Sequence, residues 1–285
     1  MWRRLARRRV RRYLTDALTV IETRALYSAT VDWPEVRAAA LLACAGAVAY
    51  ADTHETLAGV LRQAGGPHSG LRPPGASAWR AVDRPTGGLV DGVAHVRLPA
   101  CGGANRRYRD TGHRLVRDLA AAGPAGWVVD LRGNLGGSMW PMLAVVAPLL
   151  PDGVLGHFVP PDGPDQTWEL RRGRVLLGGR TLARTTGPVP PAPVAVLTDG
   201  RTASSGEAVA VAFRARPEVR TFGSATMGMT SANETHPLRG GTRLNVTVAY
   251  FADRHRTVHR GPLPPDEDGG TDPLAAAVAW VRRER

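Results

Sequence analysis

Two apolar runs in the sequence each end in a glycine- or serine-containing turn that leads directly into a helical pattern. The first is Gly126–Leu131, which runs into Arg-Gly-Asn-Leu-Gly-Gly137. The second is Pro193–Thr198, which runs into a turn that ends at the pair Ser204-Ser205. Uninterrupted apolar runs of this length are typical of parallel strands that are buried on both faces. The pattern predicts an α/β protein whose ligands bind at the carboxyl ends of the strands.

The rest of the sequence divides into three parts. Apolar residues recur at helical spacing through the first part, with Asp32 as an expected N-cap and Pro34 in the first helical turn, which predicts a helical cap over residues 1–68. Gly, Pro and Ser are concentrated in residues 69–90, which predicts an irregular connection. Residues 91–285 then alternate between strand and helix patterns and form the expected α/β core.

All 37 basic residues are arginine, and the formal net charge is +12. The absence of lysine excludes a lysine base, a Schiff base and a P-loop lysine. Seven arginines fall within residues 1–12, a segment that could contact nucleic acid or an anionic surface, although a solvated helix start is the simpler interpretation. No aromatic residues alternate with these arginines to stack on bases, so we expect no nucleic-acid partner.

The sequence gives no indication of a metal site or a membrane span. Cys44 and Cys101 are far apart, and no histidine is spaced to complete a zinc site with them. His54-Glu55 lacks the second histidine of a His-Glu-x-x-His motif. We therefore expect no cofactor. Asp16, Glu22 and Arg24 interrupt the segment after the basic start, and no apolar run is long enough to span a bilayer. We therefore expect neither a signal peptide nor a transmembrane segment, and the expected location is the cytoplasm.

The turn from Asp199 to Ala208 has the pattern expected for a nucleophile. A sharp turn between a buried strand and a helix exposes a serine hydroxyl, and the start of the helix offers unpaired backbone N–H groups to an oxyanion. A local interpretation competes with this one. Ser204 and Glu207 also have the spacing of a helix capping box.

A second loop and a histidine complete the candidate constellation. The glycines between Asp130 and Gly137 allow the backbone to approach a ligand. Their spacing matches neither a P-loop nor a dinucleotide fingerprint. The alternative to a ligand-binding loop is a tight turn between strand and helix. His68 lies in a Gly-Gly-Pro-His-Ser loop and is one of 8 histidines. Because the chain lacks lysine, histidine is the natural base for a serine nucleophile.

Taken together, these motifs resemble the core of the S41 serine peptidases, which include the carboxy-terminal processing proteases and the tricorn protease. The likeness rests on Asp130-Leu-Arg-Gly-Asn-Leu-Gly-Gly, Thr202-Ala-Ser-Ser-Gly-Glu, Thr221-Phe-Gly-Ser-Ala-Thr-Met-Gly and Gly261-Pro-Leu-Pro-Pro-Asp, and it continues through Thr30–Trp33 and Gly65–Ser69. The resemblance implies a serine endopeptidase with a ClpP/crotonase-like α/β core, a mixed and partly parallel sheet, and an N-terminal helical cap.

The resemblance also assigns roles to individual residues. Ser204 matches the family nucleophile, and His68 matches the base of the branch that uses a Ser–His dyad. Glu207, one helical turn after Ser204, either orients the site or caps the helix. The implied oxyanion or substrate-binding positions are Ser205, Gly136, Gly137 and Asn134.

Some features depart from the family pattern. Processing proteases use a lysine that follows Thr-Phe-Gly, whereas Ser224 and Ala225 stand there in this chain. The interval from His68 to the strand near Gly92 is too short for a PDZ domain. The tricorn branch adds a second serine and a carboxylate. Ser69 is available as the serine, and the candidate carboxylates are Asp253 and Glu207.

The expected partner is a peptide. A modified natural-product peptide is one candidate, by analogy with a member of the family that cleaves such a substrate. Two alternatives share the same fold. An acyl-enzyme on the same serine could be resolved by an amine or alcohol, which would make the chain an acyl-transfer or cyclising enzyme. A degenerate relative would bind peptide without cleaving it. The sequence indicates no oligomeric state.

Overall fold

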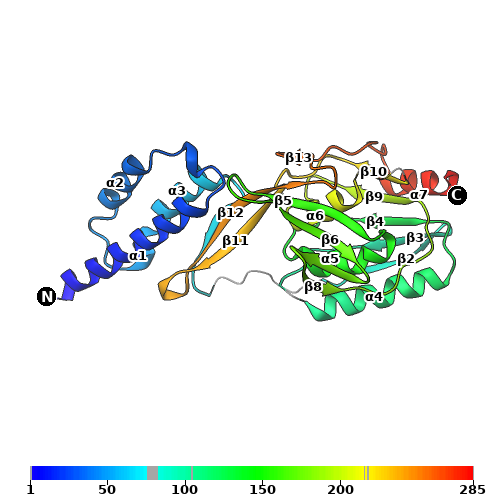
Figure 1. The fold of residues 1–285 in the computed structure, drawn as a ribbon, viewed down its shortest axis with the longest axis horizontal. Coiled ribbons are helices and arrows are strands. Elements are labelled where there is room, and N and C mark those ends of the chain that lie inside the picture. The colour runs from blue at the N-terminus through cyan, green and yellow to red at the C-terminus, as the bar shows by residue number, and fades with distance from the viewer. Residues whose placement is uncertain (1, 76–82, 104, 215, 217, 285) are drawn as a thin grey trace. The chain divides into compact units, whose positions relative to one another are not determined.

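The structure is a computed structural model that describes residues 2–75, 83–103, 105–214, 216 and 218–284, and it divides into two compact units (Figure 1). The first comprises Met1–Ser77, Pro160–Pro164 and Ser231–Ala249, and the second comprises Ala78–Val159, Asp165–Thr230 and Tyr250–Arg285. Residues 231–249 therefore belong with the N-terminal helices and not with the α/β core where the sequence analysis placed them. Sequence periodicity could not reveal this, because the grouping depends on strand pairing across more than half of the chain.

Helices make up most of the first unit. They are α1 (Trp2–Arg24), η1 (Ser28–Thr30), α2 (Trp33–Ala43), η2 (Tyr50–Thr53) and α3 (His54–Gly65). The predicted start of α2 is confirmed, because the Asp32 side chain accepts the N–H of Glu35 at 3.1 Å and Pro34 lies in the first turn. The Asp32 side chain satisfies a backbone N–H that has no partner within the helix, and Pro34 has no N–H that would need one.

Three strands complete this unit. Strand β1 (Gly70–Arg72) pairs antiparallel with β12 (Arg243–Ala252), with Gly70 opposite Asn245, and β11 (Ser231–Pro237) also pairs with β12. The strand β12 passes the boundary of the unit at Ala249. Apolar residues of α1, α3 and β12 form one core, which includes Tyr13, Leu14, Leu18, Ile21, Leu57, Leu61, Leu244 and Val246.

A five-stranded sheet forms the centre of the second unit. Its strands are β2 (Thr86–Val90), β3 (Val93–Arg97), β4 (Trp127–Asp130), β9 (Val194–Thr198) and β10 (Val219–Gly223), and their order is β10-β9-β4-β3-β2. Strands β3, β4, β9 and β10 run parallel, and β2 joins β3 as an antiparallel hairpin. The two apolar runs of the sequence are thus neighbouring parallel strands, β4 and β9. The range 69–90, expected to be irregular, contains β1 and β2.

Helices cover the central sheet. Helix α7 (Pro273–Arg283) packs through Val278 and Val281 on the face that carries Val128 and Leu197. Val129, which points to the other face, is equally buried. The remaining helices of the unit are α4 (Arg106–Ala121), α5 (Met139–Val146), η3 (Ala147–Leu149) and α6 (Ser205–Phe213).

An antiparallel sheet lies beside α5 and α6 in the same unit. It contains β5 (Gly153–Val159), β6 (Gln166–Arg171), β7 (Arg174–Leu177) and β8 (Arg180–Arg184), and the end of β12 from Tyr250 pairs with β5 and with β13 (Val258–His259). A short η4 (Arg239–Gly241) precedes β12. The predicted fold class is confirmed: the chain combines an α/β core, a mixed and partly parallel sheet, and N-terminal helices.

Candidate active site

Ser204 occupies a strained turn between β9 and α6. Its backbone angles are φ 53° and ψ −116°, a conformation that non-glycine residues seldom adopt. Ala203 and Ser205 on either side are buried, whereas Ser204 is half-buried. A serine on a strained strand-to-helix turn projects its hydroxyl away from the backbone of the turn. This local geometry is the one expected of a candidate nucleophile.

Hydrogen bonds from the preceding turn fix this serine against the glycine loop. The Asp199 carboxylate accepts the N–H of Gly133 at 3.0 and 3.1 Å. The Thr202 hydroxyl donates to the carbonyl of Leu131 at 2.9 Å. These bonds connect the loop after β4 with the loop after β9, so each loop restrains the position of the other.

Asn134 makes the central hydrogen bonds between these two loops. Its side chain is fully buried, with its Nδ2 donating to the Leu98 carbonyl at 2.8 Å and its Oδ1 accepting the N–H of Gly136 at 2.9 Å. Its own carbonyl accepts the N–H of Ala203 at 2.8 Å. The Asn134 side chain, expected at an oxyanion or substrate-binding position, is thus fully buried and holds the two loops together.

The glycine loop lies directly against Ser204. A Cβ placed on Gly136, whose φ is +94°, would come within 2.7 Å of the Ser204 Cβ and 3.0 Å of the Ser205 nitrogen. The Ser205 hydroxyl donates to the Gly137 carbonyl at 2.7 Å. Only glycine permits this approach, since the space for a side chain is occupied and φ is positive.

Two backbone N–H groups remain for an oxyanion. The Gly136 N–H is engaged by Asn134, which removes it from the two glycines that the sequence analysis proposed. Ser205 stands at the first position of α6, where an N–H has no intrahelical acceptor. Among the residues that the structure describes, neither Ser205 nor Gly137 donates its N–H to another group. Ser205 and Gly137 are the candidate oxyanion donors.

Glu207 is a buried carboxylate that supports the turn from below. One of its oxygens accepts the N–H of Ser204 at 2.7 Å. The other accepts the Thr226 hydroxyl at 2.5 Å and the Gly228 N–H at 2.8 Å. Burial raises the pKa of Glu207 above its usual value, and these hydrogen bonds oppose that rise. The capping interpretation of Glu207 is thus confirmed, and the carboxylate also ties α6 to the loop after β10.

His68 and its neighbour Ser69 lie in the first unit, whereas Ser204, Glu207 and the glycine loop lie in the second. The Nδ1 of His68 is 2.8 Å from the hydroxyl of Ser231, and the His68 carbonyl accepts the Asn233 side chain at 3.1 Å. Burial lowers the pKa of His68 to about 4, so the ring is neutral at neutral pH. In a neutral imidazole whose Nδ1 carries the proton, Nε2 has a free lone pair and can act as a base.

Comparisons with known proteins identify the family. The sequence profile of Peptidase family S41 matches residues 92–268, which is more than half of the chain. This chain belongs to peptidase family S41. It is 30% identical over 278 residues to the nisin-resistance protein of Lactococcus lactis subsp. lactis, an alignment that covers 96% of this chain and 87% of the relative.

Solved structures share the architecture of this S41 peptidase. A lipoprotein from Streptococcus agalactiae superimposes with a TM-score of 0.82 at 25% identity and covers 97% of both chains. The photosystem II D1 C-terminal processing protease superimposes with a TM-score of 0.65 at 14% identity, covering 96% of this chain and 97% of the other. The second likeness shows that the fold is shared.

Two further sequence candidates have structural roles in the S41 peptidase. The Ser69 hydroxyl donates to the Gly65 carbonyl at 3.0 Å and lies 2.9 Å from the Thr247 hydroxyl, so it holds the end of α3 to β12. Asp253 accepts the N–H groups of His255 and Thr257 at 2.9 and 3.0 Å and organises the turn between β12 and β13. Both of these hydrogen bonds use Oδ1 of Asp253, and its Oδ2 lies 3.9 Å from Nε2 of His259.

Sequence reasoning missed Ser231 and the pairing around Asp130. Ser231 follows no motif and reaches His68 only through the fold. Burial alone would raise the pKa of Asp130, but hydrogen bonds from His95 at 3.1 Å and Arg132 at 2.7 Å outweigh it and hold the pKa well below the usual range. The Asp-x-Arg spacing was the available signal for the Arg132 contact.

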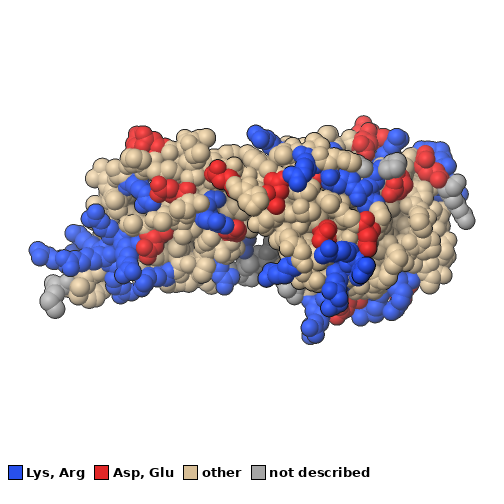
Figure 2. Space-filling model, in the orientation of Figure 1, with Lys and Arg blue, Asp and Glu red and all other residues tan. Residues whose placement is uncertain are grey.

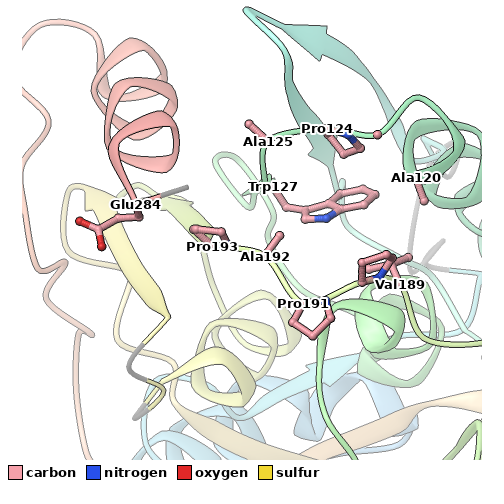
Figure 3. Close-up of a pocket in the computed structure, with 11 residues that line it drawn as sticks. Ala120, Pro124, Ala125, Trp127, Val189, Pro191, Ala192, Pro193 and Glu284 are labelled. Carbon is pink, nitrogen blue, oxygen red and sulfur yellow. The ribbon is translucent and has the colours of Figure 1, made fainter.

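The S41 peptidase also contains a cavity of about 420 Å³ at the amino ends of the central parallel strands, away from the carboxyl ends that carry Ser204 (Figure 3). Trp127 at the start of β4 and Pro193 just before β9 line it. Ser204 follows the other end of β9, so this cavity is not part of the candidate active site. The described residues contain no cluster of His, Cys, Asp and Glu side chains that could hold a metal, and no described helix is long and apolar enough to cross a membrane.

Proposed function

We propose that the chain is a serine endopeptidase that cleaves peptides through an acyl-enzyme on Ser204. The observation that carries the proposal is the strained turn of Ser204, with the backbone of Gly136 against its Cβ. Strain of this kind persists only where the surroundings enforce it, and it concentrates at functional sites. The buried bonds of Glu207 and Asn134 supply that enforcement.

The proposed reaction pairs Ser204 with His68. As Ser204 Oγ bonds to the peptide carbonyl carbon, its proton passes to Nε2 of His68. The N–H groups of Ser205 and Gly137 donate to the oxygen that becomes negative. The C–N bond then breaks, and the leaving amine takes the proton from His68. Water, deprotonated by the same ring, releases the acid and returns the proton to Ser204.

Ser231 orients the base in this scheme. In the proposed scheme the Nδ1–H of His68 donates to the Ser231 hydroxyl, 2.8 Å away, so that the Nε2 lone pair is free. A hydroxyl stabilises the imidazolium less than a carboxylate would, because it carries no charge. Ser231 is therefore a positioning residue, and the proposed dyad has no acidic third member.

The test offers the chain a peptide and weighs the products. The name of the Lactococcus relative connects that protein with nisin, so nisin is the first peptide to incubate with this chain. Hydrolysis gives fragments whose summed mass exceeds that of nisin by one water, whereas transfer to an amine or alcohol gives a product that contains the acceptor. If nisin is untouched, a mixture of short unmodified peptides is the second substrate.

Variants then assign the chemistry. Ser204→Ala and His68→Ala should remove cleavage while the chain remains folded. Ser224→Ala and His255→Ala change exposed residues of the same types and should cleave normally. Turnover that persists in Ser204→Ala would contradict the proposal.

A further inference from the structure

The first turns of α1 carry a dense arginine cluster that the proposed active site does not use. Figure 2 shows the blue of these side chains gathered around the start of the chain. We define the arginine arm as residues 2–9 of α1. Each of its residues is exposed except the half-buried Ala6, and packing against the first unit begins at Val10, which is 3% exposed. At 1.5 Å per residue the arm extends for roughly 12 Å.

The arm is electrostatically unfavourable as part of an isolated helix. Cations at a helix N-terminus oppose the positive end of the helix dipole, and the first turn contains no acidic residue. Arg3 and Arg7, and likewise Arg4 and Arg8, are like charges spaced four residues apart, which destabilises a helix. The arginines therefore do not stabilise the fold that carries them.

Contacts within the protein relieve few of these charges. Arg9 lies 3.5 Å from the Tyr50 hydroxyl and over its ring, and Arg12, just beyond the arm, lies 4.0 Å from Asp16. Arg3, Arg4, Arg7, Arg8 and Arg11 make no hydrogen bond or ion pair with any residue that the structure describes. An anion outside this chain would compensate these charges.

Apolar side chains extend along the same arm. Trp2, Ala6, Val10, Tyr13 and Ala17 follow one another at helical spacing, and the stripe is buried from Val10 onward. At its start Trp2 is 74% exposed and Leu5, one turn further, is 54% exposed. Large apolar groups beside a field of arginines suit a surface that offers both negative charge and a hydrocarbon layer.

We infer that the arginine arm docks on an anionic lipid bilayer, with Trp2 and Leu5 entering the interface and the arginines binding the head groups. Helices that combine a basic face with exposed tryptophan and leucine bind in the interfacial region of a membrane, between the head groups and the acyl chains. A second copy of the chain is disfavoured because it would bring two arginine clusters together. Nucleic acid would neutralise the arginines but would leave Leu5 without an apolar partner.

The experiment measures sedimentation of the full chain with vesicles. One set contains phosphatidylcholine alone, and the other contains equal parts of phosphatidylcholine and phosphatidylglycerol. We expect binding to the anionic vesicles at low salt, weakening as salt is raised because exposed charges are screened. Equal binding to both sets, or to neither, would overturn the inference.

Two variants separate charge from apolar contact. Substituting Arg3, Arg4, Arg7 and Arg8 by Gln should weaken binding to anionic vesicles by at least about tenfold. The matched control makes the same change at exposed arginines of the second unit, Arg172, Arg174, Arg180 and Arg184, and should bind like the natural chain. Equal losses in the two variants would show that net charge alone is responsible and would overturn the assignment to the arm.

The apolar contribution is tested with all arginines in place. Replacing Trp2 and Leu5 by Ser should weaken vesicle binding by several-fold, since less apolar area enters the interface. If this variant binds vesicles unchanged and the natural chain binds a DNA duplex more tightly than the vesicles, nucleic acid is the partner and the inference is wrong. None of the substituted residues belongs to the proposed active site, so reaction at Ser204 should be the same in every variant without vesicles.

Discussion

The carboxylate of Glu207 accepts the backbone N–H of Ser204 at 2.7 Å, one helical turn before it in the chain. The same carboxylate accepts hydrogen bonds from Thr226 and Gly228 in the loop that follows β10. A single buried acid therefore clamps the strained serine between two segments of the core. Most of the proposed chemistry depends on this clamp, because an unsupported serine would relax to an ordinary backbone conformation.

The clamp predicts the effect of Glu207→Gln. One oxygen of Glu207 serves Ser204 and the other serves Thr226 and Gly228, so a glutamine must turn its NH₂ toward a donor. We expect a loss of about 2 kcal/mol in the free energy of unfolding, measured by urea denaturation. The exposed control Glu284→Gln should change it by less than about 0.5 kcal/mol. Equal stability of the two variants would show that the clamp is dispensable.

A second prediction concerns Ser231, the hydroxyl that contacts Nδ1 of His68. Ser231→Ala should slow peptide cleavage by about tenfold or more, because the ring loses the hydrogen-bond partner that orients it through Nδ1. The control is Ser69→Ala, which removes hydrogen bonds to Gly65 and Thr247 but none to His68. It should lower the free energy of unfolding by about 1 kcal/mol and leave the pH profile of cleavage unchanged. A Ser231→Ala variant with full activity would contradict the positioning role.

The low pKa of His68 sets the acid limit of the reaction. Burial lowers this pKa from the usual 6.5 to about 4, so the ring stays unprotonated until the pH falls to that range. The rate at which a fluorophosphonate reacts with Ser204 should thus be nearly constant from pH 7 to pH 5.5 and reach half its plateau near pH 4. Intrinsic fluorescence at each pH checks that the chain remains folded. A midpoint at 6.5 or above would show that the free enzyme holds an unburied or charge-paired histidine.

The same shift affects stability with a defined sign. His68 binds a proton more weakly in the folded chain than in the unfolded chain, so its contribution to stability is complete above pH 6.5 and declines as the pH falls toward about 4. His68→Gln should therefore show a shallower loss of unfolding free energy between pH 6.5 and pH 4 than the natural chain. Parallel curves for the two chains, measured by urea denaturation, would contradict the burial of His68.

Gly136 should tolerate no side chain. In Gly136→Ala the methyl group would lie 2.7 Å from the Ser204 Cβ and 2.9 Å from the Ala203 carbonyl, at a φ of +94°. We expect the shift of the loop to misplace the oxyanion donors and to reduce cleavage by about 10²-fold or more. Gly88→Ala on β2 is the matched control, because its Cβ would meet nothing within 4 Å. Comparable activity of both variants would show that the glycine loop does not contribute to the active site.

Features of the fold and of the candidate site that depend on residues close together in the chain could be predicted from the sequence. The apolar runs before Arg132 and before Asp199 identified the two central parallel strands, and the spacing of Ser204 and Glu207 identified their hydrogen bond. The burial of Asn134 could not be predicted, because nothing in a Gly-Asn-Leu-Gly loop distinguishes an exposed amide from one that is buried and fully hydrogen-bonded. The buried amide donates to the Leu98 carbonyl, which lies directly after β3 and is brought beside the loop only by the fold.

The contact of His68 with Ser231 was beyond sequence reasoning for a related reason. The two residues are 163 positions apart, and Ser231 begins a strand without apolar periodicity. The same long-range pairing moved residues 231–249 from the expected core into the first unit. Pairing of distant strands depends on the packing of a whole unit, for which one sequence carries no local signal.

The most direct test of the central claim is the mass of the intact protein after reaction with a fluorophosphonate. We predict one phosphonyl adduct on the natural chain and on Ser205→Ala, whose change leaves the backbone N–H in place, and no adduct on Ser204→Ala. An adduct that persists in Ser204→Ala, or a natural chain that gains no mass, would contradict the assignment of Ser204 as the nucleophile.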